Sequence, residues 1–214
     1  MPQSRLITDI KLQEKRKDRF SVFLDDEFAF GLHQDVLLKS GIAKGDTLTQ
    51  EKIDAILKME LTRAAKEKAM RLLAHRARSK KELGDRLRRA GFADELIEAT
   101  IADMKRLGLV NDAEFALMFA RNRMITKPVG EFLLRRELQQ KGIGEADIVK
   151  AVAEAYKDKS EYLFAKELAA KNKKKQIKLD EAKARKRVSD FLMRRGFHWD
   201  LVNDVLEHWE NLDE

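Results

Sequence analysis

Hydrophobic positions along the chain follow two different periods. Between Leu6 and Gly31, short runs of β-branched and aromatic residues are separated by polar segments at Glu14 to Arg19 and at Asp25 to Glu27, which suit hairpin turns. This pattern predicts a small antiparallel sheet of about three strands. A sheet of this size needs a helix against one face. The segment from His33 to Lys39 is the candidate for that helix.

From Thr49 onward the apolar residues recur with the period of a helix. A long helix is predicted from about Thr49 to Ala77. Its inward face is expected to hold Ile53, Ile56, Leu57, Leu61, Ala65, Ala69, Leu72 and Leu73. The next helix covers Ser79 to Gly91, because Ser79 with Glu82 forms a capping box and Gly91 suits a left-handed end. Further helices are predicted at residues 94–107, from 111, and at 129–141, 145–156, 160–171, 180–195 and 199–212.

The helices after residue 49 repeat in groups of three. When Gly91, Gly142 and Gly196 are aligned, apolar residues recur at five fixed distances from each glycine. They are Leu83, Leu87, Phe92, Ile97 and Ile101, then Leu134, Leu138, Ile143, Ile148 and Val152, then Val188, Leu192, Phe197, Val202 and Leu206. The glycines lie 51 and then 54 residues apart. Units of this size stack on their neighbours to bury a shared core.

The predicted fold is therefore mainly α, with three tandem three-helix repeats in an elongated, curved array and a small antiparallel β-sheet extension at the N-terminus. Four segments are expected. Residues 1–48 form the sheet and its short helix, and residues 49–108, 109–157 and 158–214 form the first, second and third repeats.

Composition narrows the class of protein. The 214 residues include 44 Lys and Arg against 37 Asp and Glu, a net charge of +7, which favours a phosphate-bearing or acidic partner. The absence of cysteine excludes disulfides, thiolate nucleophiles and cysteine zinc sites. No apolar run is long enough for a signal peptide or a membrane span. A cytoplasmic protein without a membrane partner is expected, and a monomer.

Residue patterns typical of enzymes do not occur. The four histidines, His33, His75, His198 and His208, are scattered, and there is neither a His-Glu-x-x-His motif nor a phosphate-binding Gly-x-x-x-x-Gly-Lys loop. The segment Asp25 to Glu27 fits a hairpin turn better than a cation site, and Gly142-Ile-Gly144 fits a helix end and turn. We expect no catalysis, no cofactor and no metal.

Charge is distributed unevenly within each repeat. The second helices carry mainly Lys and Arg, whereas the third helices begin with acidic residues. A helix-turn-helix interpretation is disfavoured, because the positions that would approach DNA are Asp94 and Glu95, Glu145 and Asp147, and Asp200. Part of this polarity is what the helix macrodipole favours.

The sequence also contains a lysine-rich segment and two tryptophans that belong to no motif. The lysine-rich segment Lys171 to Lys178 either lies on phosphates or is simply solvated, whereas Lys15 to Lys17 suits a solvated turn. Trp199 and Trp209, near-helically spaced, are expected in the core or at its end.

Three segments resemble the RecX family of bacterial recombinase regulators. They are Arg76-Ala-Arg-Ser79-Lys-Lys-Glu-Leu83, then Leu107-Gly-Leu-Val-Asn-Asp112-Ala-Glu-Phe-Ala116, and then Gly130 leading to Arg136-Glu-Leu138-Gln-Gln-Lys141-Gly142-Ile143. The match is close from about Leu61 to Tyr156. The third repeat matches more loosely, and the N-terminal sheet resembles an extension seen in part of the family.

The resemblance implies tandem three-helix repeats and a partner. RecX proteins bind the RecA filament on DNA and suppress its ATP hydrolysis and strand exchange, which places them in DNA repair, homologous recombination and the SOS response. The residues expected to bind RecA or DNA are Arg76, Arg78, Lys80, Lys81, Arg88, Arg89, Arg123, Arg135, Arg136 and Lys141. Arg76, Arg136 and Lys141 lie within the family motifs, and the others are chosen by charge. The alternative is a stand-alone helical DNA-binding protein that uses the basic second helices.

Overall fold

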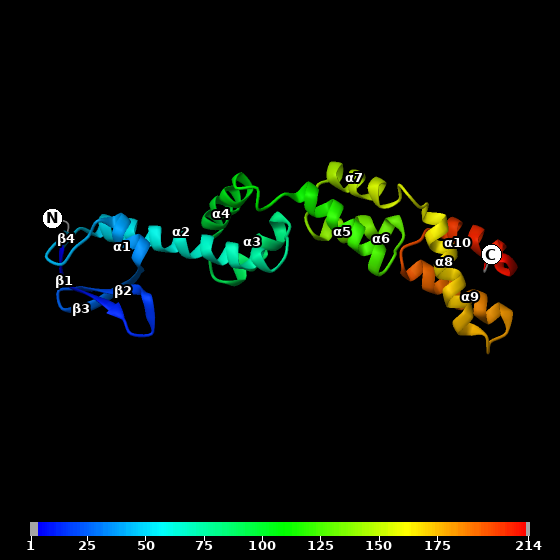
Figure 1. Ribbon diagram of the computed structural model, residues 1–214, viewed down its shortest axis with the longest axis horizontal. Helices are drawn as coiled ribbons and strands as arrows, with labels where there is room; N and C mark the ends of the chain where they lie inside the picture. The colour runs from blue at the N-terminus through cyan, green and yellow to red at the C-terminus, as the bar shows by residue number, and fades with distance from the viewer. Residues whose placement is uncertain (1–3, 213–214) are drawn as a thin grey trace. The chain divides into compact units, whose positions relative to one another are not determined.

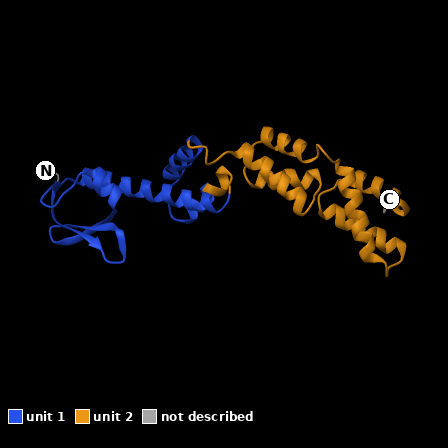
Figure 2. Cartoon of the chain, in the orientation of Figure 1, with its two compact units in different colours: residues 1–76, 84–106 blue, residues 77–83, 107–214 orange. Residues whose placement is uncertain are grey.

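The computed structural model describes residues 4–212, which are mainly helical (Figure 1). The chain forms two compact units (Figure 2). Unit 1 comprises residues 1–76 and 84–106, and unit 2 comprises residues 77–83 and 107–214. The boundary between the units falls inside one helix, α3 (Lys80–Arg89).

Unit 1 begins with a four-stranded antiparallel sheet. The strands are β1 (Arg5–Gln13), β2 (Arg16–Leu24), β3 (Glu27–His33) and the short β4 (Thr47–Leu48), in the order β3-β2-β1-β4. The predicted three strands are confirmed, and β4 is an addition. The first turn is shorter than predicted, because Gln13 already pairs with Arg16 and leaves only Glu14 and Lys15 between the strands.

The second hairpin turn confirms the prediction at Asp25 to Glu27. Asp25 and Asp26 have φ of 50° and 66°, the left-handed values that a two-residue type I′ turn requires at both positions. The carboxylate of Asp25 accepts hydrogen bonds from Arg5 Nε at 2.9 Å and from the backbone N–H of Leu6 at 3.0 Å. These bonds lower the pKa of Asp25, with the Arg5 bond as the largest cause. The acidic turn is thus held by β1.

Two helices cover one face of the sheet, α1 (Gln34–Ser40) and the first part of α2 (Gln50–His75). The core between them holds Ile7, Val22, Leu24, Phe30, Leu32, Val36, Ile42, Leu48, Ile53 and Ile56. The predicted inward position Leu61 is wrong, since its side chain is 54% exposed. Its neighbour Glu60 is buried instead, at 9% exposure.

Glu60 is buried because it has two partners in the sheet. Its carboxylate accepts a hydrogen bond from Arg19 Nη1 at 2.7 Å and another from the backbone N–H of His33 at 2.9 Å. Burial of a charge is tolerated only where such partners replace water. Apolar periodicity could not predict this position, because both partners come from strands far away in the sequence.

Replacing Glu60 with Ala should destabilise unit 1 by about 2 to 3 kcal/mol, because the change leaves the Arg19 guanidinium and a buried N–H without an acceptor. Urea denaturation followed by circular dichroism measures the loss. The exposed Glu51 on the same helix is the matched control, and Glu51→Ala should cost less than about 0.5 kcal/mol. Equal losses in the two variants would contradict this account of Glu60.

The three-helix repeats are confirmed. Unit 1 holds the rest of α2, the C-terminal part of α3, and α4 (Asp94–Arg106). Unit 2 holds α5 (Asp112–Thr126), α6 (Glu131–Gln140), α7 (Glu145–Ala155), α8 (Glu161–Lys173), α9 (Glu181–Arg194) and α10 (Trp199–Glu207), with the 3-10 turns η1 (Lys174–Gln176) and η2 (Trp209–Asn211). All the aligned apolar residues except Phe92 are buried. The three aligned glycines have φ of 90°, 76° and 82°, as left-handed helix ends require.

The two tryptophans differ. Trp209 is buried, as predicted, and the cations of Lys173 and Arg185 lie 5.0 and 5.9 Å from its ring. Trp199 is 58% exposed, so a core position is wrong for this residue, and the alternative of an end-capping position stays a prediction. It is the first residue of α10, and the buried aromatic at that turn is Phe197.

Within unit 2, successive repeats join through backbone contacts. The N–H of Gly130, at the start of α6, donates to the carbonyl of Arg195 at 2.9 Å, and Arg195 Nη1 donates to the carbonyl of Pro128 at 2.8 Å. The residues at the start of α3 repeat this arrangement, since Ser79 Oγ donates to the carbonyl of Lys141 at 2.6 Å. In each joint, the residues at the start of one repeat's second helix contact the C-terminal end of the second helix in the following repeat.

Glu161 lies at the joint of the second and third repeats, where its carboxylate accepts from the N–H of Glu131 at 2.8 Å. Burial raises the pKa of Glu161. A carboxyl group with a raised folded-state pKa weakens folding at neutral pH, and this penalty fades as the pH falls through that pKa. We expect Glu161→Gln to raise the melting temperature slightly at pH 7 and to have a smaller effect near pH 4. A gap that widens on acidification would contradict this expectation.

Candidate partner-binding surface

Two of the ten predicted binding residues, Lys81 and Lys141, make contacts within the joint between α3 and the second repeat. Lys81 Nζ donates to the carbonyl of Gln140 at 2.9 Å. Lys141 Nζ forms an ion pair with Glu82 at 2.5 Å and lies 5.8 Å from the ring centre of Phe119. These contacts give both lysines a structural role, and a role in binding stays a prediction.

Two of the predicted arginines in unit 2 are paired with carboxylates. Arg123 forms a two-pronged pair with Glu137 at 2.7 and 3.0 Å. Arg135 lies 2.7 Å from Glu131 and 2.9 Å from Glu145. The Glu131 hydrogen bond is the largest cause of a raised Arg135 pKa. Their positive charge is therefore largely neutralised within unit 2.

In unit 1, Arg88 is paired in the same way, with Asp94 at 2.8 Å and Asp85 at 3.3 Å. The residues of the α2–α3 connection are also engaged. Arg78 is only 9% exposed, and Arg76 is the exposed C-cap residue that follows α2. Both take part in interactions within the molecule.

Three predicted residues remain as exposed cations without an ion pair to any described residue. They are Lys80 at the start of α3, Arg89 at its end, and Arg136 in the middle of α6. An exposed cation without an internal carboxylate retains its full charge for a partner. Of the predicted set, these three are the strongest candidates for direct contact.

Arg136 belongs to an outward stripe on α6 that sequence reasoning missed. Phe132, four residues earlier, is 67% exposed, and Gln140, four residues later, is also exposed. Residues four apart lie on one face of a helix. Because Lys81 reaches the carbonyl of Gln140, the stripe continues onto the start of α3. We call Phe132, Arg136, Gln140 and Lys81 the α6 stripe.

The repeat alignment contained a signal for this stripe. The positions equivalent to Phe132 hold Lys81 and Lys186, and those equivalent to Arg136 hold Asp85 and Asp190. Only the second repeat therefore places an aromatic ring and an arginine outward at these two positions. Aromatic residues and arginine contribute most of the binding energy at protein interfaces.

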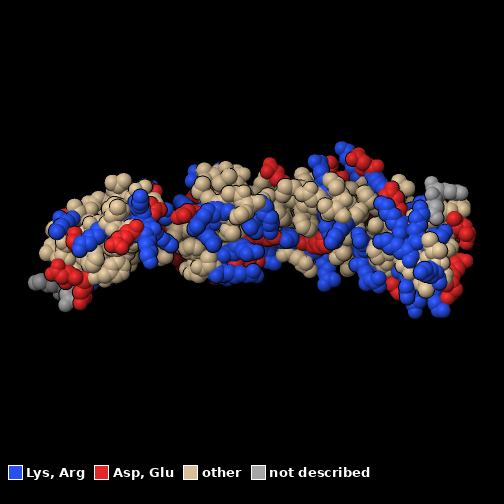
Figure 3. Space-filling view, turned by 60° about the horizontal axis from the view of Figure 1, so that its bottom comes forward, with Lys and Arg blue, Asp and Glu red and all other residues tan. Residues whose placement is uncertain are grey.

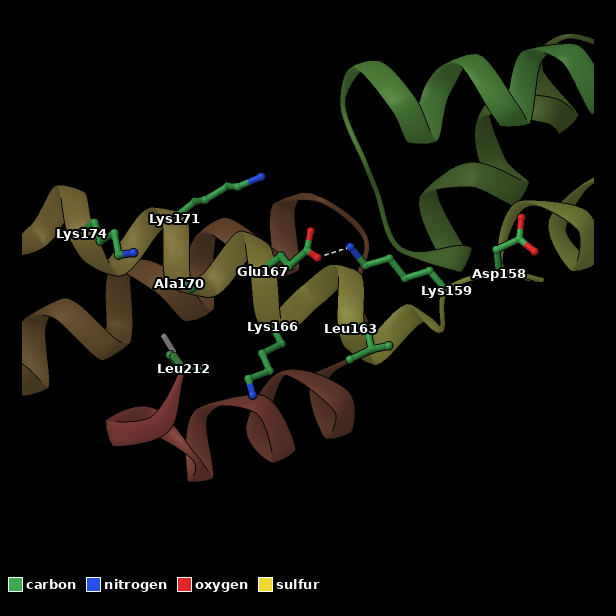
Figure 4. A pocket seen from close by; sticks show the side chains of 9 residues that line it. All are labelled: Asp158, Lys159, Leu163, Lys166, Glu167, Ala170, Lys171, Lys174 and Leu212. Carbon is green, nitrogen blue, oxygen red and sulfur yellow. Dashed lines mark ion pairs between the residues drawn. The ribbon is translucent and has the colours of Figure 1, made fainter. Parts of the chain in front are cut away.

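The third repeat carries a second cationic surface. Lys171, Lys175, Lys178, Lys186 and Arg194 are exposed and have no ion pair with a described residue. Figure 3 shows Lys and Arg side chains crowding this part of the molecule. A groove of about 610 Å³ lies along α8 and is crossed by the ion pair of Lys159 with Glu167 (Figure 4). Within the segment Lys171 to Lys178, Lys171, Lys175 and Lys178 are thus solvated, whereas Lys173 donates to the carbonyl of Trp209, and a contact with phosphates stays a prediction.

The described residues contain no group of three or more His, Asp or Glu side chains placed to hold a metal ion. Within residues 4–212, no helix is long and apolar enough to cross a bilayer. The α6 stripe offers an arginine, a lysine and one exposed aromatic ring, which suit recognition of another macromolecule.

Comparison with known proteins identifies the family. The chain matches the RecX N-terminal domain at residues 5–49 and the first, second and third RecX three-helix domains at residues 65–104, 111–152 and 165–206. It is 31% identical to the regulatory protein RecX of Clostridioides difficile, over 98% of both chains. It is 34% identical to that of Bacillus velezensis, over 97% of this chain and 80% of the relative.

Solved structures agree. A crystal structure of regulatory protein RecX matches 95% of this chain and 99% of its own, with a TM-score of 0.71 and 25% identity. The structure of RecX from Lactobacillus salivarius matches 71% of this chain and 98% of its own, with a TM-score of 0.62 and 22% identity, and supports the fold alone. The chain belongs to the RecX family of regulatory proteins.

Proposed function

We propose that this protein binds the filament that the RecA recombinase forms on DNA and inhibits its ATP hydrolysis and strand exchange. Membership in a family of regulatory proteins supports a regulatory role. The identity of the partner rests on the family resemblance. The proposed species is a cytoplasmic monomer without a reaction of its own, which acts by occupying contacts that the filament needs.

The α6 stripe is the observation that carries this proposal. Phe132 exposes most of its ring in the absence of a partner, and Arg136 has no ion pair with a described residue. Burying the ring in a pocket of RecA would remove apolar surface from water, and a RecA carboxylate would pair with the guanidinium. Binding would therefore not require Arg136 to break an ion pair with a described residue, and Phe132 is already exposed.

The ion pairs within the protein determine which arginines are suitable for a charge-reversal experiment. Reversing the charge of Arg88 or Arg135 would place a carboxylate beside their present acidic partners and would disturb the fold. Reversing Arg89 or Arg136 would change the surface alone. The direct experiment titrates the protein into a RecA ATPase assay on single-stranded DNA, and an unchanged rate at saturating protein would refute the proposal.

The stand-alone DNA-binding protein remains a second candidate, supported by the exposed cations of the third repeat, Lys186 and Arg194 on α9 among them. Binding of this kind depends steeply on salt, because each neutralised phosphate releases counterions. Tight DNA binding without RecA, falling steeply with salt and lost when Lys186 and Arg194 are reversed, would favour it.

A further inference from the structure

Unit 1 contains a cationic hollow of about 510 Å³ that no motif of the sequence indicated. It lies between the start of β2, the middle of α2 and the turn between α3 and α4. Five cationic side chains line it, Arg16, Arg19, Arg63, Lys68 and Arg71. Two different elements, β2 and α2, therefore direct positive charge to one place.

The acidic residues at this hollow are already engaged. Glu67 is shared by Arg63 at 2.9 Å and Arg71 at 3.6 Å. Asp18 lies 3.3 Å from His33 Nε2, a contact that leaves the carboxylate charge in place when the imidazole is neutral, so two carboxylates stand against five cations in the lining.

The remaining charge balance is positive. The charge of Arg19 is neutralised by its ion pair with Glu60, whereas Arg16 and Lys68 form no ion pair with a described residue. Since one glutamate serves both Arg63 and Arg71, the hollow holds a surplus of positive charge for an anionic ligand.

An aromatic side chain, Phe92, also lines the hollow. Its equivalents in the other repeats, Ile143 and Phe197, are 6% and 2% exposed, whereas Phe92 is only partly buried. In unit 2 the preceding second helix covers each equivalent turn. Added Cβ atoms at Gly142 and Gly196 would lie 2.6 Å from Lys81 and 2.3 Å from Leu133. A Cβ at Gly91 would meet nothing within 4 Å.

A second copy of this chain does not suit the uncovered turn. In unit 2 the residue before the glycine is Lys141 or Arg195, which bonds back to the preceding repeat, but in the first repeat it is Ala90. A second copy would have to cover the turn with the positions of α9 that are equivalent to Lys81 and Leu133, and these hold Lys186 and Arg187. Two cationic surfaces repel each other, so the expected occupant is anionic.

We infer that this hollow binds single-stranded nucleic acid, with phosphates held by Arg16 and Lys68 and a base stacked on Phe92. Guanidinium and ammonium groups form charge-assisted hydrogen bonds with phosphate oxygens. Cations beside an aromatic ring that lines an open hollow, as Phe92 does here, are the usual elements of single-strand recognition, because every base has a π face. This site lies outside the basic second helices and works without a recombinase, so it goes beyond the proposed function.

The test measures fluorescence anisotropy of a labelled 15-residue oligothymidylate with the full chain and no RecA. We expect Arg16→Glu with Lys68→Glu to weaken binding about tenfold or more, and to reduce the slope of log K against log salt by about 1.4, which is two phosphates at about 0.7 each. The matched control is Lys52→Glu with Lys105→Glu, which reverses two exposed cations outside the hollow and should leave both quantities unchanged.

Two further arms complete the test. Phe92→Leu keeps an apolar side chain but removes the ring, and should weaken binding about fivefold. Circular dichroism verifies that each variant is folded, and Lys68→Ala replaces the double reversal if that variant unfolds.

Wild-type affinity in both the hollow and Phe92 variants would overturn the inference. It would also be overturned if inorganic phosphate competed as well as the oligonucleotide at equal phosphate concentration, which would indicate a free-anion site. Equal competition by polyglutamate would indicate an acidic protein ligand instead, and would overturn it too.

Discussion

A double variant with Phe132→Ala and Arg136→Glu is expected to require about 100-fold more protein than the wild type for half-inhibition of RecA ATP hydrolysis on single-stranded DNA. Removal of a central aromatic or arginine anchor commonly costs about 2 kcal/mol or more, and two neighbouring anchors are not fully additive. Both residues are exposed in the free protein, so the loss should come from binding. Its melting temperature should remain near that of the wild type.

The matched control makes the same two types of change elsewhere in unit 2. Trp199→Ala removes a ring that is 58% exposed, and Lys150→Glu reverses an exposed cation on α7. This control should inhibit like the wild type. If both variants lost inhibition equally, general charge and hydrophobicity would explain the result. If the test variant inhibited normally, the α6 stripe would have no part in binding.

Replacing Gly130 with Ala should destabilise unit 2 by about 3 to 4 kcal/mol, at the upper end of the cost of overpacking. The new Cβ would lie 2.2 Å from the carbonyl oxygen of Gly196 and 2.5 Å from the backbone nitrogen of Phe197. Backbone atoms cannot move aside as the end of a flexible side chain can. The joint must open, which would also lengthen the hydrogen bond from the N–H of Gly130 to Arg195.

Gly144 provides a close control. Both glycines precede a helix, with φ of −73° and ψ of 162° at Gly130 and of 152° at Gly144, but a Cβ at Gly144 would meet nothing within 4 Å. Gly144→Ala should therefore cost only about 1 kcal/mol or less, as expected for alanine at a helix start. Urea denaturation of both variants measures the difference. Similar losses would mean that close packing at the joint is not the cause.

Much of the fold could be predicted from the chain alone. The apolar period marked the helices, and the glycine alignment identified three equivalent units whose aligned residues are buried in the structure, Phe92 excepted. These features are local, because a helix turns by a constant angle per residue and a left-handed end favours glycine. The short hairpin at Asp25 and Asp26 was predictable for the same reason.

The candidate site could be predicted only in part. Lysines and arginines on the second helices were visible in the sequence, but their partners were not. Arg123 meets Glu137 fourteen residues away, and Lys141 meets Glu82 fifty-nine residues away. Charge does not identify Phe132, which is uncharged and differs from its equivalents Lys81 and Lys186 in the other repeats.

The sequence by itself determined the secondary structure, the repeat and the surplus of basic residues. Only the tertiary structure decided which cations remain available to a partner, that Glu60 is buried, and that the turn at Phe92 lies uncovered. The physical reason is that a helix and its apolar face are set by residues a few positions apart in the sequence. The pairing of charges and the exposure of a side chain depend instead on which distant elements come into contact.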